Sequence, residues 1–394
     1  MILGGAPQPV LGGEQPDESR AAQITEQIGG MSEVAIDRGL VGEEREPPSA
    51  EEPRPAMDER LETSLHARHA DDTSRSATIP RVATRTRYAR LSTERSNPAS
   101  LDLDRLGPRQ IARLMNREDA RAVRAVGRVG SRIAATVELI VAALGRGGRL
   151  FFVGAGTSGR LGVLEAAECP PTFGTPPRLV QAIMAGGRGA VFRSREGVED
   201  DERAAVREIR RRVRRGDVVV GVSASGVTPF VRAALRTARL RGATTALVAC
   251  NATQGRLAPA RVVIDPRPGP EVLTGSTRLK AGTATKLVLN TLTTASMARL
   301  GRIHGNRMVD LQPRSRKLRA RALRLVQELG GVQRSRAIRA LAEARGQVRL
   351  AIVMAWTGGS ARDAARALRS AGGSLRTVLE TAGPVPTDGR DRRR

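Results

Sequence analysis

Short apolar runs alternate with segments of helical period through the middle of the chain. Five of the runs have the length of buried strands: residues 149–154, 178–184, 217–223, 244–250 and 261–265. The polar-faced segments among them have the period of helices, most clearly at residues 200–215, 228–241 and 280–300. Continuous apolar strands that alternate with helices are typical of a parallel sheet covered on both faces. The pattern therefore predicts an α/β fold, with a parallel five-stranded sheet flanked by helices.

Helical periodicity also precedes and follows this region. Residues 111–119 and 122–147 predict two helices, and a third is expected to run from the first strand to about residue 168, where Pro170 and Pro171 should stop it. From about residue 317 the pattern is all-helical, in segments 321–330, 333–346, 347–356, 360–373 and 374–380. We therefore expect three parts: a sheet domain at 89–316, a small helical C-terminal domain at 317–385 and a tail at 386–394.

Residues 1–88 differ from the rest of the chain. They mix Pro, Gly, Glu, Arg and Ser with few large apolar residues and no sustained period, which predicts a disordered N-terminal extension. The chain has no apolar run of 18 residues and no basic segment followed by an apolar one at its start, so neither a membrane span nor a secretory signal is expected. Its two cysteines form no disulfide framework, and a cytoplasmic location fits best.

The net charge of +26 would suggest a nucleic-acid partner if the basic residues were clustered. Only three of the 66 basic residues are lysines, and the arginines are spread along the chain, as a GC-rich genome would produce. Aromatic residues, which stack on bases, make up 2% of the chain. We expect non-specific affinity for anions and no specific nucleic-acid function.

Two loops rich in glycine and hydroxyl groups each follow a strand and open a helix. Residues 154–159, GAGTSG, match the dinucleotide fingerprint, but the next strand ends without the acid that would hold a ribose. Thr157 and Ser158 at a helix start instead favour a phosphate-binding loop without a nucleotide. In residues 223–229, SASGVTP, the hydroxyls of Ser223, Ser225 and Thr228 are more than an ordinary helix cap needs. Both loops should lie at the carboxyl edge of the sheet, in one crevice.

Two acidic segments and one basic segment add candidate chemistry. Glu168 comes at a helix end, where the dipole favours the protonated carboxyl, which suits an acid or base; a solvated surface glutamate explains it equally well. Glu199 belongs to a run of acids before a helix, and capping alone could account for that run. Residues 274–286 hold two of the three lysines among hydroxyls, which suggests an anion contact.

Several of these stretches together resemble the N-acetylmuramic acid 6-phosphate etherase family of the sugar isomerase (SIS) fold. The resemblance runs from about residue 91 to residue 379 and is carried by TERSNPASLDLD, GAGTSGRLGVLEAAECPPTFG, EGVEDD, SASGVTPFV, TGSTRLKAGTATKLVLN and GNRMVD. The ECPPTFG and TRLKAGTATK stretches are specific to this family and its close relatives. An SIS aldose–ketose isomerase shares the phosphate loop but lacks the ECPPT stretch.

The resemblance implies a homodimer that uses no metal and no organic cofactor. The substrate would be N-acetylmuramic acid 6-phosphate, and the products N-acetylglucosamine 6-phosphate and D-lactate, in cell-wall sugar recycling. By resemblance, Glu168 assists the departure of lactate and then activates water, and Glu199 is the second carboxylate, the base at C2. Substrate contacts are expected from Thr157, Ser158, Ser223, Ser225, Thr228, Lys280 and Thr283.

Two other functions are compatible with the same fold. The glucokinase regulatory protein resembles this family and binds sugar phosphates without converting them, but it carries two SIS domains in a longer chain. The single set of loops and the two acids favour the enzyme over such a sensor. An SIS transcription regulator would need a DNA-binding helical domain before residue 90, and that segment is too polar for one.

Overall fold

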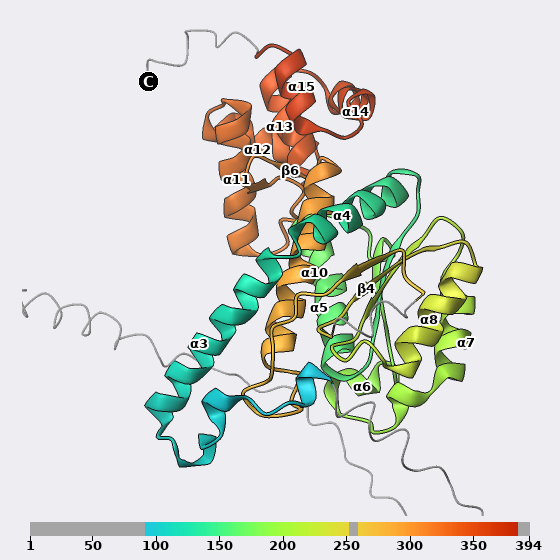
Figure 1. Ribbon diagram of the computed structural model, residues 1–394. Coiled ribbons are helices and arrows are strands. Elements are labelled where there is room, and N and C mark those ends of the chain that lie inside the picture. Colours follow the sequence, from blue (N-terminus) through green and yellow to red (C-terminus); the bar gives the residue numbers. More distant parts are fainter. Residues whose placement is uncertain (1–90, 252–258, 385–394) are drawn as a thin grey trace, which may run out of the picture. The chain divides into compact units, whose positions relative to one another are not determined.

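The computed structural model describes residues 91–251 and 259–384, and the expected N-terminal extension and tail lie outside them. A parallel sheet forms the centre of this region (Figure 1), and its strands have the order β2-β1-β3-β4-β5. The strands are β1 Leu150–Gly154, β2 Val180–Met184, β3 Val218–Val222, β4 Thr244–Val248 and β5 Val262–Ile264. This confirms the parallel five-stranded sheet that the apolar runs predict.

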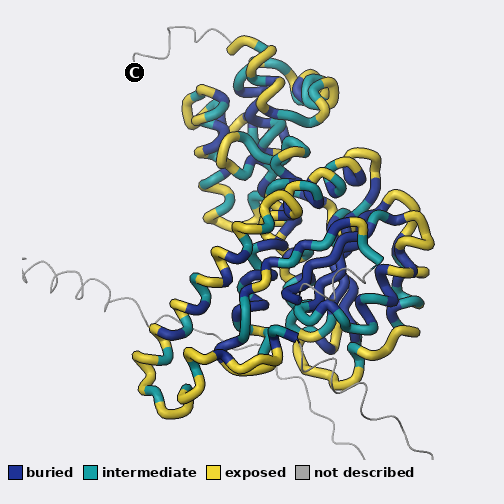
Figure 2. Tube along the Cα trace, in the orientation of Figure 1, coloured by how far each residue is buried: buried dark blue, intermediate teal, exposed yellow. Residues whose placement is uncertain are grey.

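Alternation of side chains along each strand divides the core into two layers. In β1, Leu150 and Phe152 pack on one face of the sheet, and Phe151 and Val153 pack on the other. Because both faces are covered, β1 and β3 are buried at every position and carry no polar side chain, and Figure 2 shows the strands as a largely buried layer. The first face is covered by α4 Gly130–Gly145, α5 Gly156–Phe173 and α10 Lys280–Arg299, the second by α7 Glu202–Arg212 and α8 Pro229–Leu240.

Two boundaries differ from the sequence prediction. The helix expected over residues 122–147 is divided: α3 runs over Pro108–Gly127 and α4 starts at Gly130, because two glycines flank a non-helical Val129. The expected stop at Pro170 is wrong, since α5 continues to Phe173. Phe173 is buried in the core, and Gly174, with φ of 62°, donates its N–H to the carbonyl of Pro170 at 3.0 Å. Packing of the last turn thus outweighs the two N–H groups that the prolines lack.

An arm of three short 3-10 turns precedes α3. The turns are η1 Ser92–Glu94, η2 Pro98–Ser100 and η3 Leu103–Arg105. The backbone N–H and the hydroxyl of Ser92 both donate to Oδ1 of Asn251, just after β4, at 2.7 and 2.6 Å. Gly275, in the loop before α10, donates its N–H to the carbonyl of Thr93 at 3.1 Å. The arm is therefore held against the carboxyl edge of the sheet.

A buried ion pair joins α3 to the start of α10. The side chain of Lys280 is 2% exposed, and its Nζ lies 2.7 Å from Oε2 of Glu118, whose side chain is fully buried. Asn97 of the arm donates to the same oxygen at 3.0 Å. Burial opposes ionisation of Glu118, but the hydrogen bonds from Lys280 and Asn97 outweigh it and hold its pKa below the usual value. One carboxylate thus connects the arm, α3 and α10.

Five helices with a core of their own follow the sheet region. They are α11 Arg316–Gly330, α12 Arg334–Glu343, α13 Val348–Thr357, α14 Ala361–Ser370 and α15 Leu375–Thr381. The central helix, α13, buries five consecutive residues, 351–355. A small antiparallel hairpin, β6 Ile303–His304 with β7 Arg307–Met308, precedes these helices. The helical C-terminal region predicted from the sequence is confirmed.

Removal of Lys280 should destabilise the fold strongly. We expect Lys280→Ala to lower the free energy of unfolding by about 3–5 kcal/mol, because Glu118 stays buried without its cation. Lys317 is exposed and serves as the matched control. Lys317→Ala should change the free energy of unfolding by less than about 0.5 kcal/mol. Urea unfolding followed by circular dichroism measures both. Equal stabilities of the two variants would contradict the structural role of the pair.

Candidate active site

The loop between β1 and α5 is a tight turn that only glycine permits at two positions. A Cβ on Gly154 would lie 2.7 Å from the backbone nitrogen of Gly159, and a Cβ on Gly159 would lie 2.7 Å from the carbonyl oxygen of Gly154. The turn brings Thr157 and Ser158 into the first turn of α5, where the helix amides have no acceptor within the helix. Amides, hydroxyls and the helix dipole together make this loop suitable for an anion.

The second hydroxyl-rich loop, between β3 and α8, is held by its own side chains. The hydroxyl of the buried Ser223 lies 2.7 Å from that of Thr228 and 3.3 Å from that of Ser225, and it accepts the N–H of Gly226 at 3.0 Å. The N–H of Val227 reaches Ser225 Oγ at 3.3 Å. The buried Ser223 therefore fixes the loop from its interior side. Ser225 and Thr228 remain partly exposed at the surface of the loop.

Both loops open into one crevice of about 320 Å³. Five of the predicted site residues contribute to its lining or its support: Thr157, Ser158, Ser225 and Thr228 line it, and Ser223 lies beneath. Glu199 also lines it, in the 3-10 turn η4 Val198–Asp200 that follows β2. The prediction that the two hydroxyl loops lie in one crevice at the carboxyl edge agrees with this arrangement, whereas of the two predicted acids Glu199 lines it and Glu168 does not.

Three charged residues of the crevice were not singled out from the sequence, Glu94, Arg160 and Arg195, and a fourth, Glu196, belongs to the same acidic run as Glu199. Arg160 donates to the carbonyls of Val191 and Ala190 at 2.8 and 2.9 Å, and so holds the short helix α6 Gly189–Phe192 beside the crevice. Glu94 arrives on the arm, far away in sequence. Its only sequence signal is its place in the TERSN stretch, because its position depends on the contact between Thr93 and Gly275.

Glu168 lies outside the crevice of its own chain. It is exposed on α5, twelve residues after Gly156, which corresponds to about 18 Å along the helix axis. The adjacent Cys169 is buried, and burial, with the nearby carboxylates Glu165 and Glu168, raises its pKa to about 12. This thiol is therefore protonated at neutral pH and is no nucleophile.

Lys280 and Thr283 are not among the residues that line the crevice. Lys280 is paired with Glu118 in the interior, and Thr283 donates to Oδ1 of Asp119 at 3.2 Å. Both side chains connect α10 to α3. The sequence suggested that Lys280 contacts an anion. In the structure that anion is the carboxylate of Glu118.

Sequence reasoning also missed a buried carboxylate between α5 and α10. Glu165 is 5% exposed and accepts hydrogen bonds from Lys286 at 2.9 Å and from Thr293 at 2.8 Å. These contacts fix the face of α5 on which Glu165 lies, one turn before Glu168. Lys286 therefore also binds a carboxylate of the protein.

No group of three or more His, Cys, Asp or Glu side chains within residues 91–251 and 259–384 has the arrangement of a metal site. Over the same residues, no helix combines the length and the apolar character that crossing a bilayer requires.

Comparison with known proteins finds a matching family model, similar relatives and solved structures. A family model described as the glucokinase regulatory protein N-terminal SIS domain matches residues 132–239. An N-acetylmuramic acid 6-phosphate etherase of a Nostoc species is 50% identical over 292 residues, 73% of this chain and 94% of the relative. The etherase of Geobacillus thermodenitrificans is 49% identical over 293 residues, 74% of this chain and 99% of the relative. A phosphoheptose isomerase structure from Neisseria gonorrhoeae, 17% identical with a TM-score of 0.37, covers 49% of this chain and 100% of its own.

The match to the etherases extends over nearly their whole length and includes both hydroxyl loops, the two acidic segments and the start of α10. The chain therefore belongs to the N-acetylmuramic acid 6-phosphate etherase family.

Proposed function

We propose that the chain cleaves the lactyl ether of N-acetylmuramic acid 6-phosphate, giving N-acetylglucosamine 6-phosphate and D-lactate, in the recycling of cell-wall amino sugars. Membership of the etherase family supports this substrate. The observation that carries the proposal is the crevice, because it combines two hydroxyl-lined loops with a carboxylate at one edge of the sheet.

The hydroxyl loops are suited to the phosphate end of the substrate. The first-turn amides of α5 and the hydroxyls of Thr157 and Ser158 can donate to phosphate oxygens, and Ser225 and Thr228 face the same space. The sugar would then extend from this loop towards Glu199. No metal and no organic cofactor is needed for the reaction below.

The reaction is an elimination followed by addition of water. Opening of the ring exposes an aldehyde, which acidifies the proton at C2. A base takes that proton, the C3–O bond breaks, and an acid protonates the lactyl oxygen as lactate leaves. Water then adds at C3 of the unsaturated intermediate, and C2 regains a proton. We assign the base at C2 to Glu199, and the acid, which afterwards activates water, to Glu168.

The distance between the two glutamates suggests how the site is completed. A hexose phosphate bound at the start of α5 does not reach Glu168 of the same chain, about 18 Å along the helix. Glu168 is exposed, so a second chain can use it. We propose a two-fold homodimer in which Glu168 of each chain completes the crevice of the other, because the same surface then serves both sites.

A cytoplasmic location is part of the same proposal. Both cysteines, Cys169 and Cys250, are free and buried, as a reducing compartment allows.

The first experiment is D-lactate release from N-acetylmuramic acid 6-phosphate by the purified full chain without added metal. We expect release, and Glu199→Gln should slow it by about 10²–10⁴-fold, because a positioned base is lost. The neighbouring Asp200 is exposed and outside the crevice, and Asp200→Asn should remain near wild type. Binding of substrate without any release by the unmodified chain would instead favour a non-catalytic sugar-phosphate regulator.

Exchange of the C2 proton with solvent separates the roles of the two acids. In D₂O, N-acetylglucosamine 6-phosphate should gain deuterium at C2 with Glu168→Gln, since Glu199 still removes that proton, whereas lactate release should fall by about 10²-fold or more. Glu199→Gln should lose both reactions. NMR measures the exchange. If exchange survived in Glu199→Gln and were lost in Glu168→Gln, the roles of the two glutamates would be reversed.

Mixing two inactive variants tests whether the sites are shared. Glu168→Gln and Glu199→Gln chains, unfolded together and refolded, should give mixed dimers with one intact site, and activity should return to about one quarter of the wild-type value. Each variant refolded alone is the control. A mixture that stays as inactive as its components would show that both acids of a site come from one chain.

A further inference from the structure

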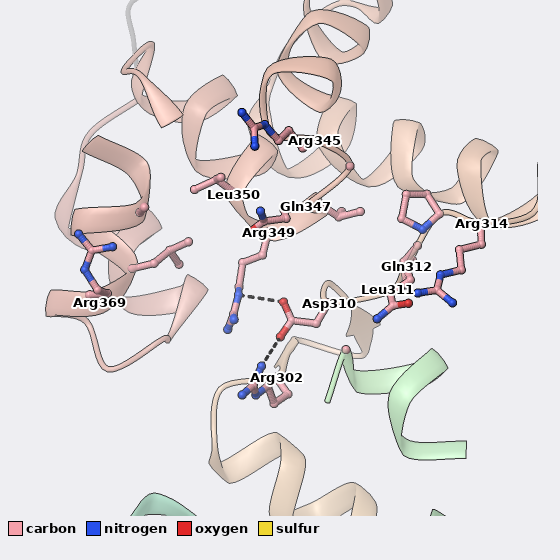
Figure 3. A pocket seen from close by; sticks show the side chains of 16 residues that line it. Arg302, Asp310, Leu311, Gln312, Arg314, Arg345, Gln347, Arg349, Leu350 and Arg369 are labelled. Carbon is pink, nitrogen blue, oxygen red and sulfur yellow. Dashed lines mark hydrogen bonds and ion pairs between the residues drawn. The ribbon is translucent and has the colours of Figure 1, made fainter. Parts of the chain in front are cut away.

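A second cleft, of about 680 Å³, lies where the helical C-terminal region meets the end of α5 (Figure 3). Five arginines from separate segments of the chain line it: Arg302, Arg314, Arg345, Arg349 and Arg369. One acid, Asp310, lines it as well. We call this the arginine cleft. Its volume is in the range of small-molecule sites, and its charge is strongly positive.

Asp310 shows that arginines of this cleft bind a carboxylate. Arg349 Nε lies 2.9 Å from one oxygen of the Asp310 carboxylate, and Arg302 Nη1 lies 3.2 Å from the other. In Figure 3 the carboxylate is held between the two guanidinium groups. Asp310 is 10% exposed, so it is a fixed part of the wall. It balances one of the five positive charges of the cleft.

The other three arginines have no such partner in the part of the chain that the structure describes. Arg314, Arg345 and Arg369 are exposed and make no ion pair with any residue in 91–251 or 259–384. The first residues of α13, Val348 to Leu350, also line the cleft, and the N-cap of this helix, Gln347, gives no side-chain hydrogen bond. The cleft thus holds unused donors as well as uncompensated positive charge.

The backbone of Arg345 points to a requirement for its side chain. Arg345 follows Ala344, the C-cap of α12, and has φ of 50°, a conformation that favours glycine. The N–H of Gly346 reaches the carbonyl of Leu341 at 2.8 Å, and that of Arg345 reaches Ala342 at 3.0 Å, the bonds of a Schellman motif.

Elsewhere the chain places glycine at this position. The helices α5, α11 and α13 end in the left-handed conformation at Gly174, Gly331 and Gly358. After α12 the glycine, Gly346, comes one residue later, and Arg345 adopts the left-handed conformation before it. Residues in this conformation are enriched at functional sites, and within the described residues the other non-glycine example is Arg267, with φ of 53°.

We propose that the arginine cleft is a second binding site of this protein, for a small phosphorylated molecule. Guanidinium groups bind phosphate oxygens in pairs, and the cleft supplies several of them around one concave space. The arginine cleft is distinct from the crevice. The crevice lies at the first turn of α5, and the cleft lies at the C-cap of the same helix, Gly174. The 18 residues from Gly156 to Gly174 span about 27 Å along the helix.

The test is calorimetric titration of the full chain with inorganic phosphate and with glucose 6-phosphate, at about 150 mM salt to suppress non-specific binding. Arg345→Gly removes one guanidinium and also relieves the backbone strain. Arg362→Ala is the matched control, because Arg362 is exposed on α14 but does not line the cleft. Tighter binding of glucose 6-phosphate than of phosphate would identify an organic phosphate as the ligand; equal binding would identify the phosphate group alone.

We expect Arg345→Gly to lose one binding site per chain, or to weaken it by about tenfold or more, while its melting temperature rises. Arg362→Ala should bind like the wild type, and both variants should release lactate normally, which separates this test from that of the crevice. Equal binding by Arg345→Gly and Arg362→Ala would overturn the proposal. Absence of any phosphate binding outside the crevice in the wild-type chain would overturn it as well.

Discussion

The register of three parallel strands is the constraint on which the crevice depends. Gly154 of β1 is paired with Met184 of β2 and with Val222 of β3, so the three strands end at the same level. The loops that follow therefore start side by side, two with hydroxyls and one with a carboxylate. A slip of one residue would turn the apolar side chains of a strand to the opposite face. Both faces are packed against helices, and so the core, as well as the loops, sets the geometry of the site.

The crevice relies on hydroxyls and amides in a chain that is rich in cations. Its two arginines donate to backbone carbonyls: Arg160 to Val191 and Ala190, and Arg195 to Gly186. Glu199 makes no ion pair within the part of the chain that the structure describes. A carboxylate in the crevice without an ion pair there fits the role proposed for Glu199 as the base at C2. The arginines shape the walls of the crevice, and the two loops present neutral donors.

The sequence was sufficient for features that depend on neighbouring residues. The five strands, α7, α8 and α10 follow from local period, and the hydroxyl loops follow from their place between a strand and a helix. Features that depend on distant contacts could not be read in this way. The exposed Glu168 and the buried Lys280 both stand in motif-like stretches, and only tertiary packing separates them from the crevice. The continuation of α5 through two prolines likewise depends on the burial of Phe173 in the core.

Arginine and lysine are used differently in this fold, and the difference gives meaning to the arginine cleft. The planar guanidinium joins separate segments through several donors: Arg149 binds Asp217 and the carbonyl of Arg212, and Arg349 binds Asp310 and the carbonyls of Gly301 and Gly373. The compact ammonium of Lys280 is used instead where one buried carboxylate must be met. Arg345 occupies a left-handed position at the end of a helix where other helices of this fold have glycine. The cost of that conformation supports the proposal that its guanidinium serves the cleft.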